Sequence, residues 1–132
     1  MYRWIGGGCV LLLLGAYFIL PKILATPPVP PSKTQRDLTV ICNAIDHFSL
    51  ECGRYPLQKE GLQALIERPK ALANWQGPYL KEPIPADEWG NQYVYRIPGK
   101  NGKTGYSVTS YGADGAPGGT GPAADLISGN DY

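Results

Sequence analysis

The distribution of apolar residues predicts one amphipathic helix in the middle of the chain. A single apolar stripe with helical spacing is formed by Leu38, Ile41, Ile45 and Phe48. This stripe predicts a helix over residues 33–51, with polar side chains on its opposite side. Thr34 and Asp37 resemble a capping box at the start of the helix, with Asp in place of Glu, and Gly53 is a natural stop after its end.

The pattern after this helix predicts short elements separated by loops. Residues 60–67 are interpreted as one short helical turn with an apolar face. Residues 92–97 alternate tyrosine with other side chains, which is typical of a half-buried strand. Residues 106–111 predict a second strand and residues 126–128 a third. The predicted fold class is therefore α+β, with the amphipathic helix packed on a small three-stranded antiparallel sheet.

The first part of the chain is strongly apolar. Residues 5–24 carry no charge except Lys22, and about 20 such residues suffice to cross the hydrocarbon core of a bilayer. We therefore expect residues 1–25 to form an uncleaved transmembrane helix that anchors the chain. A secretory signal peptide is the alternative, although its apolar core is usually only about 7–15 residues long. Residues 26–32 form a Pro-rich linker that excludes helix, and residues 33–132 form the soluble domain.

Composition and charge argue against several classes of function. The 12 basic and 11 acidic residues give a net charge of +1, so the chain carries no electrostatic footprint for nucleic acid. His47, the single histidine, and the unevenly spaced cysteines make no zinc pattern. We find no catalytic constellation and expect no enzyme activity. The adjacent acids Asp87 and Glu88 are interpreted as a solvated turn before Gly90 and Asn91.

The cysteines leave a disulfide open. Cys9 lies in the apolar run and is interpreted as a small membrane-buried residue. Cys42 and Cys52 would be able to bond in an oxidising compartment if the helix ended before Cys52. An unbroken helix would hold them roughly 15 Å apart, which is too far for a disulfide.

A glycine-rich stretch near the end of the chain carries the most specific chemistry. Residues 110–129 hold Asp114 and Asp125, and between these acids lie glycines, prolines and no apolar side chain larger than alanine. Such a segment buries too little surface to order itself. Calcium would order it, because glycines let backbone carbonyls turn inward and Asp supplies charged oxygens. A flexible loop with two solvated acids is the alternative, and the spacing is not that of an EF-hand.

Aromatic residues gather between the predicted helices and strands. Trp75, Tyr79 and their neighbours are interpreted as rings that close a small core. The alternative is a membrane-tethered periplasmic binding module in which Trp75, Tyr79 and Trp89 present an aromatic face to a glycan or an exported protein.

The order of motifs resembles the major pseudopilin of type II secretion systems. The resemblance is carried by GRYP (53–56), EGLQAL (60–65), WQGPYLK (75–81), IPADEWGNQYVY (84–95) and SYGADGAPGGTGPAAD (110–125). It implies a pilin-like periplasmic domain on a bacterial inner-membrane anchor. It also implies that the chain polymerises with other pseudopilin subunits and meets inner-membrane components of the secretion system, supporting protein export across the outer membrane.

The same resemblance implies a structural calcium ion in the glycine-rich loop. Carried over to this chain, the side-chain ligands are Asp114 and Asp125, and the likeliest backbone ligand is the Tyr111 carbonyl, with Thr120 and Ser128 as weaker candidates. One feature departs from the family. Pilins carry a Glu near the start of the membrane helix, whereas no acid precedes Asp37 here, so we expect an anchored subunit without the standard processing.

Overall fold

The computed structural model describes residues 32–98 and 105–130. The chain divides into two units at Pro30–Pro31, and all described residues belong to the second unit. The predicted anchor at residues 1–25, Cys9 within it, and the predicted linker up to residue 31 lie outside the described residues. Within the part of the chain that is described, no helix is both long and apolar enough to span a bilayer.

The predicted amphipathic helix is confirmed as α1, Lys33–Cys52. Its capping box differs from the predicted one: the N-cap is Ser32, whose hydroxyl accepts a hydrogen bond from the Gln35 N–H while the Gln35 side chain accepts from the Ser32 N–H. The predicted cap at Thr34 is wrong because Thr34 lies inside the helix and is fully buried. Gly53 ends the helix in the left-handed conformation, as expected.

One side of α1 forms the core. All four residues of the predicted stripe are at most 4% exposed, and they are Leu38, Ile41, Ile45 and Phe48. The stripe packs against apolar and aromatic side chains of the sheet, including Tyr95, Tyr106 and Val108. His47 lies off this stripe and is exposed.

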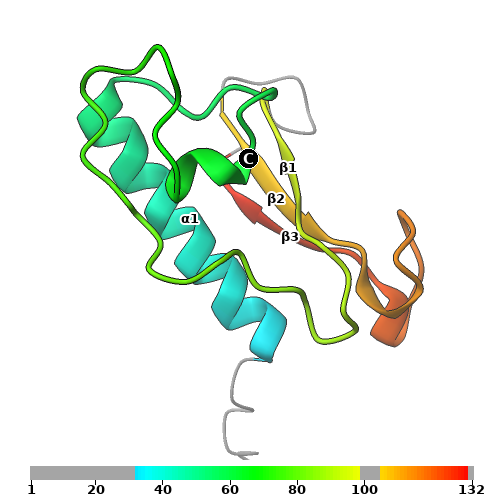
Figure 1. Cartoon of the computed structure of the whole chain (residues 1–132). Coiled ribbons are helices and arrows are strands. Elements are labelled where there is room, and N and C mark those ends of the chain that lie inside the picture. The colour runs from blue at the N-terminus through cyan, green and yellow to red at the C-terminus, as the bar shows by residue number, and fades with distance from the viewer. Residues whose placement is uncertain (1–31, 99–104, 131–132) are drawn as a thin grey trace, which may run out of the picture. The chain divides into compact units, whose positions relative to one another are not determined.

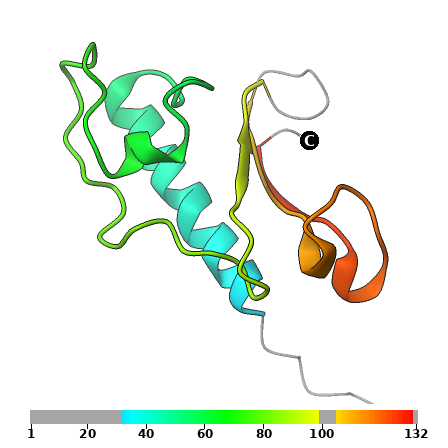
Figure 2. The same cartoon turned by 45° about the vertical axis from the view of Figure 1, so that its right-hand side comes forward.

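The second layer is a three-stranded antiparallel sheet in the order β1-β2-β3. Its strands are β1 (Val94–Arg96), β2 (Ser107–Ser110) and β3 (Leu126–Gly129). All three predicted strands are present, each near its predicted position. The register pairs Tyr95 with Val108 and Val108 with Ser128, so these residues share the face of the sheet that α1 covers (Figure 1). Seen along its edge, the sheet stands beside the helix as a separate layer (Figure 2).

The segment between α1 and β1 covers the remaining side of the core. It contains the 3-10 helix η2 (Leu62–Leu65) inside the predicted turn at residues 60–67. The Arg54 guanidinium binds both carboxylate oxygens of Glu60 at 2.8 Å, which fixes the start of this segment. The Trp75 indole N–H donates to the Ala64 carbonyl at 2.8 Å. The Trp75 and Tyr79 rings meet edge to face, which confirms that the aromatic cluster closes the core.

Both described cysteines are free thiols. Because α1 continues without a break through Cys52, Cys42 and Cys52 lie far apart along one helix and cannot bond. The Cys42 thiol instead donates to the Ser128 hydroxyl across the helix–sheet interface at 3.4 Å. The disulfide that the sequence left open is therefore not formed.

Tyrosine hydroxyls connect the sheet to the polar edge of α1. The Tyr106 hydroxyl lies 3.0 Å from Asp46 Oδ1 and 3.1 Å from the Cys42 carbonyl oxygen. The Tyr93 hydroxyl donates to Asp37 Oδ2 at 3.0 Å. Each ring thus fills the core while its polar end finds a partner on the helix, which fixes how the helix lies across the strands.

We expect Tyr106→Phe to lower the free energy of unfolding by about 2 kcal/mol, because it removes a hydrogen bond to a charged group and keeps the buried ring. Urea unfolding of the full chain in detergent, followed by tyrosine and tryptophan fluorescence, measures this. Tyr111→Phe is the matched control, since the Tyr111 hydroxyl only accepts from Arg96 on the exposed side at 3.3 Å. The control should change the free energy by less than about 0.5 kcal/mol. Equal effects of the two variants would contradict the assigned role of Tyr106.

Candidate functional site

The glycine-rich stretch forms the connection between two paired strands. β2 ends at Ser110 and β3 begins at Leu126, and these two residues are partners in the ladder. Tyr111 and Asp125 therefore flank the base of the connection, which we call the glycine loop (residues 111–125). In Figure 2 the glycine loop extends beyond the end of the sheet, away from α1.

The glycine loop folds into two short turns that pack against each other. These are η3 (Gly112–Asp114) and η4 (Gly121–Ala123). Positive φ angles occur at several loop residues, all of them glycine: Gly112, Gly115, Gly118, Gly119 and Gly121. A side chain on Gly112 would lie 2.8 Å from the carbonyl oxygens of Pro122 and Ala124, and one on Gly119 would lie 2.3 Å from that of Ala123. Backbone carbonyl groups thus crowd the inner side of the loop, where only glycine fits.

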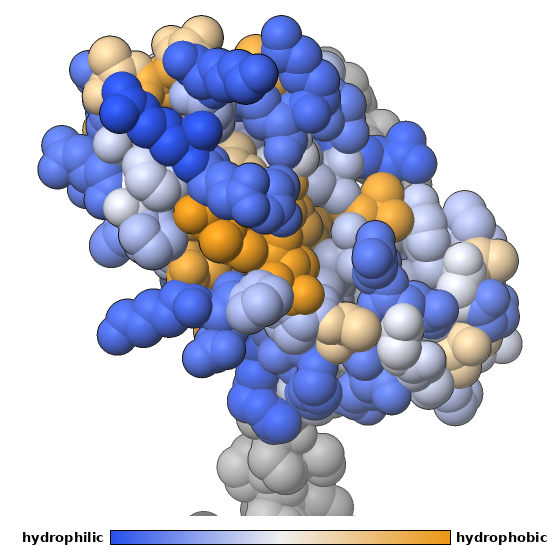
Figure 3. Space-filling model, viewed as in Figure 1, coloured by the Kyte–Doolittle hydropathy of each residue, from blue (hydrophilic) through white to orange (hydrophobic). Residues whose placement is uncertain are grey.

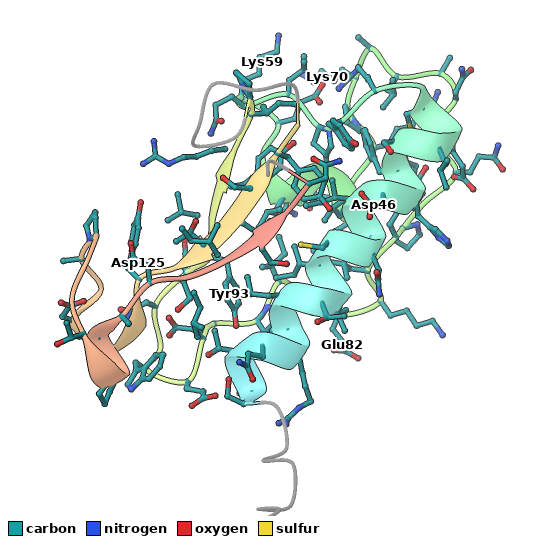
Figure 4. The ribbon with its side chains drawn as sticks, turned by 180° about the vertical axis from the view of Figure 1, so that it is seen from behind. Asp46, Lys59, Lys70, Glu82, Tyr93 and Asp125 are labelled. Carbon is teal, nitrogen blue, oxygen red and sulfur yellow. The ribbon has the colours of Figure 1, made fainter. Side chains whose placement is uncertain are left out.

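Both predicted acidic ligands bind backbone amides inside the glycine loop. Asp114 closes η3, and its Oδ1 accepts from the Ala116 N–H at 3.1 Å. Asp125 Oδ1 accepts from the Gly118 N–H at 2.9 Å, across the loop. Each bond uses one oxygen atom, and a carboxylate has a second oxygen with further acceptor capacity. Figure 4 shows Asp125 at the loop end of the molecule, far from Asp46 and Lys70.

The structure places the predicted backbone ligand Tyr111 and the two weaker candidates, Thr120 and Ser128, in different positions. Tyr111 is the residue before η3, so its backbone belongs to the base of the glycine loop. Thr120 precedes η4 and is exposed. Ser128 lies on β3 opposite Val108, with its hydroxyl bonded to Cys42 of α1. Ser128 therefore belongs to the helix–sheet interface, and we leave it out of the ligand set considered below.

The donor set of the glycine loop suits a hard cation. Two carboxylates and several inward carbonyls offer only oxygen, which calcium prefers, and contain no sulfur or imidazole. Among residues 32–98 and 105–130 there is no cluster of three or more His, Cys, Asp or Glu side chains that would hold a metal. A metal in the glycine loop would therefore depend on backbone carbonyls in addition to Asp114 and Asp125.

A buried carboxylate supports the glycine loop from outside. Asp87 is 5% exposed, which corrects its interpretation as part of a solvated turn. Its Oδ2 accepts from the Ser110 hydroxyl at 2.7 Å, and its Oδ1 accepts from the N–H groups of Trp89 and Asn91 at 3.0 and 2.8 Å. The turn itself is present, since Gly90 N–H donates to the Asp87 carbonyl at 3.2 Å. What the sequence did not reveal is that this turn closes around a buried charge.

The same network holds both polar groups of Gly112. Its N–H donates to the Ser110 hydroxyl oxygen at 3.2 Å, and its carbonyl accepts from Asn91 Nδ2 at 2.9 Å. Gly112 is the first residue of η3, so Asp87 and Asn91 determine where the glycine loop starts. Asp87 and Asn91 stand near Gly90, a pattern that predicts a turn in which Asp and Asn side chains bind the neighbouring backbone. The bond from Ser110 of β2 to Asp87 could not be predicted, because Ser110 lies far along the chain.

The environment of Asp87 favours its charged form. Burial raises the pKa of this carboxyl group, but the hydrogen bonds from Ser110 and from the backbone N–H groups of Asn91, Trp89 and Gly90 outweigh burial, so its pKa lies below the usual value. Asp87 therefore contributes stability above the pKa of an unfolded Asp, about 3.9, and loses this contribution as the pH falls through its lower folded pKa.

An apolar hollow lies on another face of the domain. It has a volume of about 460 Å³ and lies between α1, which contributes Val40, and a segment that contributes Leu80, Pro83 and Pro85. Val40 is 55% exposed. Figure 3 shows apolar side chains gathered at the centre of this face, surrounded by hydrophilic ones. Contiguous exposed apolar surface with a polar border is typical of a contact with another protein chain.

The aromatic residues do not form one exposed face. Trp75 and Tyr79 are half-buried and packed against the core, where Tyr79 also meets Phe48 edge to face. Trp89 alone of the three predicted platform residues is exposed, at 39%. A glycan platform needs coplanar exposed rings, so this arrangement disfavours it.

Comparisons with known proteins agree on one family. The sequence model described as type II secretion system (T2SS), protein G, matches residues 30–129. The type II secretion system core protein G of Vibrio cholerae serotype O1 is 36% identical over 123 residues, an alignment that covers 89% of this chain and 82% of that protein. The protein of the same name from Pseudomonas aeruginosa is 34% identical over 124 residues, covering 89% and 85%.

A solved structure gives the same answer. The crystal structure of the major pseudopilin from the type 2 secretion system of enterohaemorrhagic Escherichia coli superposes with a TM-score of 0.59 at 29% sequence identity. The superposition covers 72% of this chain and 78% of that chain.

We expect Asp87→Asn to weaken the dependence of stability on acid. In the unchanged chain, the urea midpoint should fall as the pH drops below about 4, because protonation of Asp87 removes a stabilising charge. The Asn variant should be less stable at neutral pH and should show a shallower fall, measured on the full chain in calcium-free buffer. Asp114→Asn, which removes an exposed carboxylate, is the comparison and should lower the urea midpoint at neutral pH by less than Asp87→Asn does. An Asp87→Asn chain with an unchanged acid slope would refute the assigned role of this carboxylate.

Proposed function

Because the chain belongs to the type II secretion system protein G family, we propose that it is a structural, major-pseudopilin-type subunit of the pilus-like assembly of a type II secretion system, with a glycine loop ordered by calcium. The observation that carries the structural role is the family match over residues 30–129 together with the helix-on-sheet fold. The calcium ion is the finer part of the proposal and rests on the chemistry of the loop.

The glycine loop supports calcium binding by its geometry and composition. Asp114 and Asp125 would supply the charged oxygens, and the Tyr111 carbonyl, with carbonyl groups from η4, would supply neutral ones. Thr120, which stands at the start of η4, is a further candidate. Calcium, when bound, supplies a charge that holds the loop closed. Its role would be structural, because binding to the folded chain adds directly to the free energy of unfolding.

The proposed location follows from the family and from the apolar start of the chain. Residues 1–25 would anchor the subunit in the bacterial inner membrane, residues 26–32 would form a linker, and the domain of residues 33–132 would lie in the periplasm. Neighbouring pseudopilin subunits are the proposed partners, in a homo- or hetero-polymer. We assign the apolar hollow beside Val40 to contact with such a subunit.

The proposed role is non-catalytic. The buried titratable group nearest the glycine loop, Asp87, has its oxygens engaged by Ser110 and by backbone amides, which suits a structural role. The alternative of an aromatic binding module is less well supported, because Trp75 and Tyr79 are used in core packing.

Calcium is expected to raise the melting temperature of the full chain in detergent. At a calcium concentration about 100 times the dissociation constant, the added stability is about 2.7 kcal/mol, which corresponds to a rise of roughly 10 °C or more for a domain of this size. Asp114→Ala should lose most of this rise. Ser128→Ala is the control, because Ser128 lies at the helix–sheet interface and should leave the calcium effect unchanged. If the unchanged chain has the same melting temperature with calcium as with EGTA, the calcium part of the proposal is wrong.

Val40→Asp is expected to reduce crosslinking of the chain into higher multimers in cells that carry its secretion genes. The charge would enter the apolar hollow, where a neighbouring subunit would have to desolvate it. Leu50→Asp is the matched control: Leu50 is 80% exposed on the same helix and lies outside the hollow. Secretion should fall with Val40→Asp and not with Leu50→Asp. If Val40→Asp forms the same crosslinked multimers as the unchanged chain, the hollow is not a subunit contact.

A further inference from the structure

Residues 86–91 touch both the glycine loop and the first turn of α1, and we call them the bridge segment. Toward the loop, Asp87 binds Ser110, whose hydroxyl oxygen accepts from Gly112 N–H, while Asn91 donates to the Gly112 carbonyl. The Asn91 amide also lies against Gly115, where an added side chain would meet its Oδ1 at 3.2 Å. The bridge segment thus contacts the first residue of η3 and the residue that follows it.

The other side of the bridge segment contacts α1. Thr34 and Glu88 bind each other reciprocally: the Thr34 N–H donates to Glu88 Oε1 at 3.2 Å, and the Glu88 N–H donates to the Thr34 hydroxyl oxygen at 3.3 Å. Lys33 Nζ donates to the Ala86 carbonyl at 2.6 Å. Thr34 is fully buried, whereas Glu88 and Lys33 are exposed, so this contact lies at the edge of the core.

The bridge segment is internally closed and therefore transmits displacement. The Asp87 N–H donates to the Asn91 carbonyl at 2.9 Å, and the Asp87 side chain binds the N–H groups of Trp89 and Asn91. A short turn held by its own hydrogen bonds moves as a unit, so a displacement of Asn91 also displaces Glu88.

We propose that the bridge segment couples calcium occupancy of the glycine loop to the order of the first turn of α1, with Asp87 and Asn91 as positioning residues for the loop. This inference rests on the proposed calcium site. Calcium that fixes η3 would fix Gly112 and, through the bridge segment, Thr34. The turn that gains order directly follows the predicted Pro-rich linker in the sequence, so calcium would stiffen the domain at the end that leads toward the predicted anchor.

Amide hydrogen exchange of the full chain in detergent, with calcium chloride or with EGTA, tests the coupling. Calcium should slow exchange in the glycine loop and, by about fivefold, at the amides of residues 34–37. Slowing in the loop without slowing at residues 34–37 would overturn the coupling and leave the calcium site intact. No slowing in either place would overturn the calcium site and the coupling together.

Asn91→Ala tests the loop side of the bridge segment. It should raise the calcium dissociation constant about tenfold, as is typical when a residue that orients a metal site is lost, and should abolish the calcium effect at residues 34–37. Gln92→Ala is the matched control, since it removes the exposed amide next in the chain. If Asn91→Ala lowers the melting temperature equally with calcium and with EGTA and leaves the dissociation constant unchanged, Asn91 only supports the fold and the proposal is wrong.

Glu88→Ala tests the helix side. It removes the acceptor of the Thr34 N–H but keeps the bonds made by the Glu88 N–H and the Ala86 carbonyl. Calcium should therefore still slow exchange in the glycine loop and should slow it less at residues 34–37 than in the unchanged chain. Glu88→Gln replaces the carboxylate by an amide whose oxygen accepts the same bond, and it should behave as the unchanged chain. A calcium effect at residues 34–37 that is undiminished in Glu88→Ala would refute the proposed route.

Discussion

The arrangement of the loops depends on one buried carboxylate. A buried charge is tolerated only when hydrogen-bond donors surround it, and Asp87 collects them from its own turn and from Ser110 at the end of β2. These donors are far apart in the sequence, so satisfying Asp87 fixes where the turn, the strand and the start of the glycine loop meet. A change that left this carboxylate unpaired would destabilise all of these segments at once.

The three-stranded sheet depends on α1 for its stability. A sheet of three short strands is marginal alone, because its strands pair few backbone groups and its faces need cover. α1 covers one face, and the tyrosines of the sheet reach past the apolar stripe to Asp37 and Asp46 on the helix. Apolar burial therefore gives the layers their attraction, while directional hydrogen bonds at the ends of the rings fix the angle and register between them.

Features set by local periodicity could be predicted from the sequence, and those set by distant partners could not. The apolar stripe of α1, the stop at Gly53 and the buried Tyr95 of β1 follow from local sequence patterns and are confirmed. The helix cap was misplaced because Thr34 is buried by a tertiary contact with Glu88. Asp87 was misread for the same reason, since its burial depends on Ser110. The calcium ligands remain a prediction, because spacing and family likeness indicate them and no distance to a metal tests them.

The glycine loop shows why a protein would place a metal on such a segment. Its turns need positive φ angles, and glycine supplies these at a large cost in backbone entropy. The crowded carbonyls near Gly112 and Gly119 leave no room for side chains that would repay this cost by burying apolar surface. Hydrogen bonds that Asp114 and Asp125 accept from backbone N–H groups offset part of this cost. A divalent cation that binds the remaining oxygens would offset more, and it would do so only where calcium is abundant, so the order of the loop would depend on the compartment in which the subunit lies.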